Sequence, residues 1–327
     1  MVGIILAIVL TLSAAAGGIA YASQDSMPGD TFYPVKLGIE QMRVMLPGSE
    51  VVKVERTLRF AERRIEEMQA LAENERSQYM GMSVEGYDSA LNITLTRLDW
   101  AQNRGLAIGN LTALVANATA KHLCVFDSVY DMVPPTAREA IAHAMNVSET
   151  GYFHALVALS KNNTVRVAEM NLAAMEGRLN RVRTRSQNAE VVQIALQQFE
   201  AMADFNEQIS QIAQGRILNM TEVEDLIAAA TLKHLEMLAD VWEKVPGQAQ
   251  PAIERVMANL MICQQNRVEA LEQKGAKAPP SPQIPEKIRI RVQQRIQEQE
   301  QQWPDGTIPS WQEVPAEAGQ QNSHSLG

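Results

Sequence analysis

The sequence predicts an all-α protein made of two tandem duplicated helical-bundle units of about four helices each. Residues 118–134 read ATAKHLCVFDSVYDMVP, and residues 230–246 read ATLKHLEMLADVWEKVP. A match of this length within one chain indicates an internal duplication. The composition agrees, because the helix formers Ala, Leu, Met, Gln and Glu dominate and segments with the period-two alternation of strands are rare.

Length and charge set limits on the domain organisation and on the partners. The chain has 327 residues, enough for two modest cores, and a net charge of −9. We expect a signal peptide or membrane anchor at 1–22, a leader with a short helix at 23–49, unit 1 at 50–160, unit 2 at 161–274 and a flexible Pro/Gln-rich tail at 275–327. The acidic balance argues against nucleic acid as a partner, because phosphate contacts need clustered Lys and Arg.

The N-terminal segment predicts export. Residues 2–22 carry no charged side chain and end in Ala20-Tyr21-Ala22, a typical signal-peptide cleavage pattern. Met1-Val2-Gly3 lacks the Lys or Arg that usually precedes such a segment, so a retained anchor of near-spanning length is the alternative. We therefore expect an extracellular or cell-envelope protein that touches a membrane only through residues 2–22, if they are not removed.

The leader contains a turn and a short helix. Pro28-Gly29-Asp30 is typical turn chemistry, and Pro34 suits the first turn of a helix that ends before Pro47. The pattern P-G-D-x-x-Y-P-x-K at 28–36, together with the helix carrying Ala61-Glu62-Arg63-Arg64, resembles an uncharacterised family of exported helical domains of bacteria and archaea. The resemblance implies a helical fold and an envelope location, and it implies no reaction. Unit 2 lacks this opening, so the leader is expected to lie outside the repeated core.

Each unit is expected to hold four helices joined by short loops. The first helix of unit 1 has apolar residues at steps of three and four from Val51 to Ala72, and unit 2 repeats this rhythm from Val165 to Val182. The other helices are expected at about 87–102, 111–132 and 136–160 in unit 1, and at about 191–213, 221–244 and 248–273 in unit 2. This pattern favours an up-and-down bundle in each unit. A continuous right-angled array of eight helices is the alternative.

Two histidines at equivalent positions are the candidate site residues. His122 and His234 lie on the inward stripes of their helices, and a buried imidazole needs partners for its nitrogens. Glu62 and Glu169, placed alike on the first helices, are the candidate acceptors or, with the histidines, metal ligands. Satisfied core histidines are the structural interpretation, and a metal site or a pH-sensitive latch is the functional one.

No catalytic motif is recognised in the sequence. It has no H-E-x-x-H, no Glu-x-x-His pair at the histidines, no G-x-S-x-G, no P-loop and no G-x-G-x-x-G. We therefore predict no catalytic residue, and no cofactor apart from the alternative of a metal ion. Cys124 and Cys263 are interpreted as two small buried hydrophobes, with a single bridge between the units as the alternative.

Six N-x-S/T sequons exceed the number expected by chance, and they predict N-glycosylation in an exported protein. They begin at Asn92, Asn110, Asn117, Asn146, Asn162 and Asn219. The alternative is that Asn110 and Asn219 are helix caps and that the others are incidental.

Taken together, these features predict a non-enzymatic exported helical protein of the cell envelope or surface, acting as a binding or structural module. Its partner would be an envelope or surface protein or polymer. The alternative is a metal-binding or pH-sensing envelope protein that uses His122 and His234.

Overall fold

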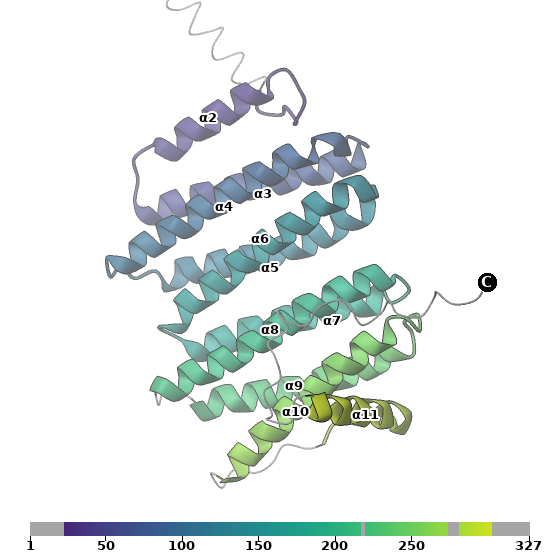
Figure 1. The fold of residues 1–327 in the computed structure, drawn as a ribbon. Helices are drawn as coiled ribbons and strands as arrows, with labels where there is room; N and C mark the ends of the chain where they lie inside the picture. The colour runs from purple at the N-terminus through teal and green to yellow at the C-terminus, as the bar shows by residue number, and fades with distance from the viewer. Residues whose placement is uncertain (1–22, 217–219, 274–280, 303–327) are drawn as a thin grey trace, which may run out of the picture. The chain divides into compact units, whose positions relative to one another are not determined.

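A computed structural model describes residues 23–216, 220–273 and 281–302, and all regular structure in these ranges is helical (Figure 1). The predicted all-α fold is confirmed. The chain splits into two compact units, Met1–Asn162 and Asn163–Gly327. Within the described ranges, no helix combines the length and hydropathy that crossing a membrane requires.

Unit 1 consists of two helical hairpins with one further helix against them. Its elements are α2 (Tyr33–Met45), α3 (Glu50–Glu73), the short 3₁₀ helix η1 (Ser77–Tyr79), α4 (Met80–Asn103), α5 (Gly109–Met132) and α6 (Pro135–Ser160). Helix α3 pairs with α4 and α5 with α6, while α4 packs on α6 and α3 on α5. Helix α2 lies alongside α3, outside the four-helix core (Figure 1).

Local sequence signals explain several helix ends in unit 1. The Ser49 side chain caps α3 by accepting a hydrogen bond from the amide of Val52. Proline stands in the first turns of α2 and α6, where its missing N–H is not needed. The predicted leader helix ends before Pro47, as expected. Val51, placed on the inward stripe by periodicity, is 47% exposed, and the buried stripe of α3 begins at Val54.

Helix α4 begins about two turns earlier than the sequence suggested. Its first residues include buried Met80 and Val84, which continue the inward face. The interruption of this face by Gly81, Ser83 and Gly86 hides the apolar periodicity.

Unit 2 repeats the same pairing. Its elements are α7 (Thr164–Thr184), α8 (Ala189–Arg216), α9 (Met220–Trp242), α10 (Gln250–Gln273) and α11 (Glu286–Gln302). Helix α7 pairs with α8 and α9 with α10, while α7 packs on α9 and α8 on α10. The four core helices of each unit therefore make contacts in the same order, as a tandem duplication requires.

Part of the segment expected to be a flexible tail is an ordered helix. Helix α11 packs against α10, and Ile284, Ile288 and Val292 are buried. These residues recur at steps of four, as expected for one buried face of a helix. The expectation of a flexible tail is wrong for 286–302.

Candidate functional site

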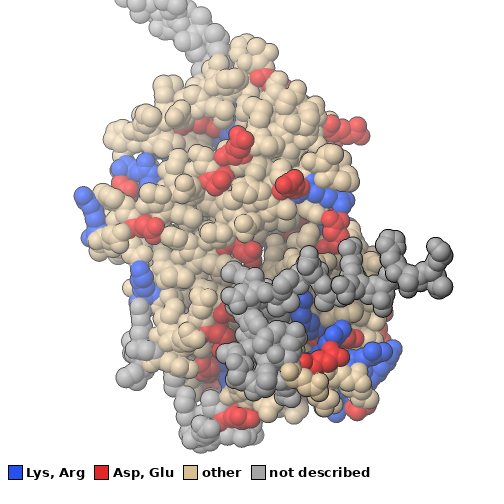
Figure 2. Space-filling model, in the orientation of Figure 1, with Lys and Arg blue, Asp and Glu red and all other residues tan. Residues whose placement is uncertain are grey.

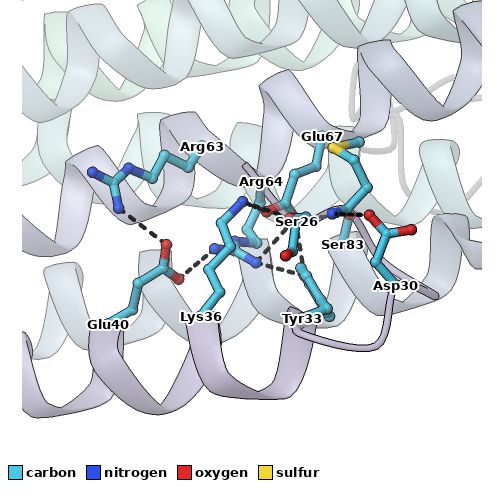
Figure 3. Close-up of polar contacts among 10 residues, drawn as sticks. Ser26, Asp30, Tyr33, Lys36, Glu40, Arg63, Arg64, Glu67 and Ser83 are labelled. Atoms are coloured by element: carbon cyan, nitrogen blue, oxygen red, sulfur yellow. Dashed lines mark hydrogen bonds and ion pairs between the residues drawn. The ribbon is translucent and has the colours of Figure 1, made fainter. Parts of the chain in front are cut away.

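Beneath α2 lies a buried charge network that periodicity did not predict (Figure 3). We define the network by Tyr33, Lys36 and Glu40 of α2, Arg64 and Glu67 of α3, and Ser83 of α4. The three α2 residues stand at i, i+3 and i+7, so they share one face of the helix. That face is turned toward α3, and all six side chains are buried.

The network is closed by short polar contacts. Glu67 receives hydrogen bonds from Tyr33 Oη and Arg64 Nη1, each at 2.9 Å, and from Ser83 Oγ at 3.2 Å. Lys36 Nζ lies 2.8 Å from the second oxygen of Glu67, and Arg64 also bonds Glu40. Burial and the neighbouring charge of Glu67 raise the pKa of Tyr33, so its hydroxyl keeps the proton it donates. Two cations and two carboxylates thus balance one another out of water.

The leader turn is fastened to Arg76, in the segment that follows α3. Asp30 accepts a hydrogen bond from the amide of Met27 at 2.7 Å, and Arg76 bonds Asp30 at 2.8 Å and the Pro28 carbonyl at 2.9 Å. The backbone hydrogen bond first, and Arg76 second, lower the pKa of Asp30. The residues of the P-G-D-x-x-Y-P-x-K pattern therefore hold the leader on unit 1.

Gly29 is required by both its backbone and its surroundings. Its φ is +90°, and a Cβ there would lie 2.5 Å from the Tyr79 ring. We expect Gly29→Ala to destabilise the leader by about 1–3 kcal/mol, because strain and overlap add. Limited proteolysis of the leader measures this. Gly38→Ala is the matched control, since a Cβ at Gly38 meets nothing within 4 Å, and unchanged or slower cleavage is expected there. Equal cleavage of both variants would contradict the argument.

His122 is a buried core histidine with a partner. Its Nδ1 lies 3.1 Å from the Tyr87 hydroxyl, and the two rings meet edge to face at a centroid distance of 5.7 Å. Burial, helped by Lys121, lowers the pKa of His122 to about 4, so the imidazole is neutral near neutral pH.

His234 occupies the equivalent place in unit 2 without that partner. Tyr87 stands 35 residues before His122, and Phe199 stands at the same spacing before His234. The Phe199 ring meets His234 edge to face at 5.3 Å, and neither ring nitrogen has a hydrogen-bond partner among the described residues. Burial also lowers the pKa of His234 to about 4.

The carboxylates proposed for the histidines lie elsewhere. Glu62 and Glu169 are exposed, whereas His122 and His234 are buried, so the structure does not bring the four residues together. Across the described residues, no cluster of three or more His, Cys, Asp or Glu side chains is placed to hold a metal ion. The partner of His122 is the phenol of Tyr87, which the sequence did not predict.

Phe199→Tyr tests this comparison of the two cores. The added hydroxyl would give His234 the partner that Tyr87 gives His122, and a cavity of about 40 Å³ borders the ring. We expect the free energy of unfolding of unit 2 to rise by about 1 kcal/mol in denaturant titration. Phe205→Tyr, at a second buried ring of α8, is the control and should destabilise. A loss of stability in Phe199→Tyr would contradict the equivalence.

The cavity in unit 2 lies where the repeats differ at two positions. In unit 1 a Cβ at Gly151 would lie 2.9 Å from Leu91, so the leucine fills the space over the glycine. At the matching positions unit 2 has Ala203 and Cys263, and both line the cavity. Burial raises the pKa of the Cys263 thiol to about 11, so it stays protonated.

Glu200 also lines this cavity and is only 3% exposed. Burial raises its pKa to about 7, although Arg255 at 3.3 Å opposes the shift. The pair Glu200–Arg255 matches Asp88–His143 in unit 1, where His143 Nε2 lies 3.7 Å from Asp88 Oδ2. Such a small cavity has room for a water or an ion rather than an organic ligand.

The cysteines do not pair in the structure. Cys124 is exposed on α5 and Cys263 is half-buried on α10, so the interpretation as buried hydrophobes is wrong for Cys124.

The described sequons lie on exposed asparagines. These are Asn92, Asn110, Asn117, Asn146 and Asn162, while Asn219 lies outside the described residues. Asn110 is not the cap of its helix, because the N-cap of α5 is Ile108. The hydroxyls of Thr94 and Thr119 are buried and bond carbonyls of their own helices. Glycosylation stays a prediction.

Helix α2 presents apolar side chains to solvent. We call Phe32, Val35, Leu37, Met42, Met45 and Leu46 the α2 apolar face; each is at least 37% exposed, and Met45 reaches 75%. The surface at the α2 end of unit 1 is mostly uncharged in the view of Figure 2. Contiguous exposed apolar surface usually marks an interaction site.

Comparisons with known proteins agree with the helical fold. A solved structure described as a computational design of self-assembling cyclic protein homooligomers has a chain 16% identical to this one, with a TM-score of 0.51. The match covers 77% of this chain and 98% of that chain, and at this identity it concerns the fold alone. No curated protein matches the chain. Residues 25–136, which contain the leader, the charge network and His122, match the family model described as a domain of unknown function, DUF5667.

Proposed function

We propose that this chain is an exported, non-enzymatic helical protein of the cell envelope or surface that acts as a binding or structural module. The observation that carries the proposal is the α2 apolar face, held outward on a rigid support. A solvated helix normally turns such side chains inward. Apolar side chains that point outward from a helix held in place by buried contacts are expected at a surface that binds a partner.

Two further features support this reading. Residues 2–22 form an uncharged apolar run of the kind that directs export. The charged groups of the network under α2 are buried and paired with one another, and they hold the leader on unit 1. Because they are buried, a substrate could not reach them.

The metal-binding alternative is not favoured by the geometry. Glu62 and Glu169 are exposed and away from the buried histidines. A pH-sensing role near neutrality is not favoured either, because the pKa values of both histidines are lowered to about 4.

Export can be tested through Cys124. Its thiol is exposed, so a membrane-impermeant maleimide should label it in intact cells as well as in lysed cells. Cys124→Ser is the control for label on Cys263. Labelling that requires lysis would place the chain inside the cell and overturn the proposal. Crosslinking from Met42→Cys, with Leu114→Cys as the control, should then capture the partner of the α2 apolar face.

A further inference from the structure

Helix α2 is packed with its polar side inward. Its buried residues are Tyr33, Lys36 and Glu40, which bind Arg64 and Glu67 of α3. Among the exposed residues of α2, Gln41 is the one polar side chain. The apolar side therefore faces away from unit 1, which reverses the usual orientation of a surface helix.

The chain that precedes α2 indicates what covers this side. Residues 2–22 are uncharged and apolar, and about 20 such residues are long enough to span a bilayer. The described chain begins at Ser23, which is buried, and Lys36 donates a hydrogen bond to the Ser26 carbonyl at 3.0 Å. The point where residues 2–22 join unit 1 is thus fixed beside the first turns of α2.

We propose that α2 lies on the surface of a lipid bilayer, with its apolar face in the interface and residues 2–22 anchored in the same bilayer. This inference rests on the proposed function, and it names the partner of the α2 apolar face. Interfacial helices of this kind bury their apolar side roughly 5–10 Å into the boundary between headgroups and acyl chains.

The attachment is hydrophobic rather than electrostatic. Of the two cations on α2, Lys36 points inward and pairs with Glu67, and Arg43 in the last turn is only partly exposed. Arg64 beneath the helix is neutralised by Glu67 and Glu40. A polybasic surface would respond to anionic lipid and to salt. The α2 apolar face should respond little to either.

Depth-dependent quenching tests the inference on the full chain. In a Cys124→Ser, Cys263→Ala background, an environment-sensitive fluorophore is attached at Met42→Cys in α2 or at Leu114→Cys in α5. Met42 is 62% exposed and Leu114 is 40% exposed, so both sites accept a label. Each protein is reconstituted into phosphatidylcholine vesicles with or without lipids that carry quenchers near the headgroup.

The expected result is a blue-shifted emission at Met42 and quenching several-fold stronger than at Leu114. Phosphatidylserine and high salt should change the Met42 signal only slightly. Equal quenching at both sites would overturn the inference. So would a blue shift at Met42 without lipid quenching, because protein would then cover the face, either a second copy or residues 2–22. The maleimide experiment separately reports failure of the proposed export.

Discussion

Arg64→Met should lower the free energy of unfolding of unit 1 by about 3–5 kcal/mol, the usual cost of leaving buried charges without their partner. Arg64 is 2% exposed and bonds Glu40, Glu67 and the Tyr33 hydroxyl. Its removal leaves two buried carboxylates with Lys36 as their one buried cation in the network. We expect α2 to detach before the four-helix core unfolds, since these contacts are its main hold on α3.

Arg63→Met is the matched control. Arg63 is the neighbouring residue and also pairs with Glu40, at 3.1 Å, but its side chain is 42% exposed. An exposed pair contributes only about 0–1 kcal/mol, so this variant should remain close to the parent in chemical denaturation. A similar decrease in the free energy of unfolding in the two variants would show that burial is not what makes Arg64 important.

A double variant separates the network from simple packing. Arg64→Met combined with Glu67→Leu removes one charge of each sign and leaves Lys36 to face Glu40. If the cost of Arg64→Met comes from unpaired charge, the double variant should be more stable than the single one. Additive losses would instead assign the effect to lost packing around the arginine stem. Hydrogen exchange along α2 measures both outcomes.

The orientation of α2 shows where reasoning from sequence stops. Pro34 and Pro47 predict that a short helix exists and ends before Pro47, and the structure confirms both. Burial of apolar surface is the usual rule, and it would turn Val35 and Met42 inward. The polar side of α2 is buried instead, because it bonds Arg64 and Glu67 of α3. No local sequence pattern reveals partners that lie 24 to 34 residues away.

In the repeats, too, the sequence predicts some features of the histidine sites and not others. Equivalent positions for His122 and His234 follow from the duplicated segments, and the structure places both in cores against an aromatic ring. The hydrogen bond to the histidine in unit 1, and its absence in unit 2, depend on Tyr87 and Phe199. These residues lie on α4 and α8, which the duplicated segment does not include. Extending the repeat upstream at constant spacing would have found this pair. The cavity, by contrast, depends on how side chains fill space in three dimensions.

Acid should destabilise unit 1 more than unit 2. A histidine with a folded pKa of about 4, against 6.5 when unfolded, stabilises the fold fully above 6.5, and this contribution is lost as the pH falls toward 4. Each shift corresponds to about 3 kcal/mol. In unit 2, Glu200 acts in the opposite sense, because a folded pKa of about 7 favours the fold at low pH and weakens it as the pH rises from 4.5 to 7. His234 and Glu200 therefore largely cancel, whereas the effect of His122 remains.

Hydrogen exchange at pH 7 and pH 4.5 reports the two units separately and can test this balance. His122→Leu should remove most of the acid sensitivity of unit 1, yet lower the free energy of unfolding by about 1 kcal/mol at pH 7, because the buried Tyr87 hydroxyl keeps Ser148 but loses its hydrogen bond with His122. His234→Leu should leave the free energy of unfolding of unit 2 at pH 7 nearly unchanged or raise it. The His234 nitrogens have no hydrogen-bond partner among the described residues to lose. His143→Leu is the control, because that side chain is 55% exposed and should leave the acid response unchanged. Equal acid sensitivity of the two units, together with an unchanged response in His122→Leu, would show that buried imidazoles do not govern the stability of this protein in acid.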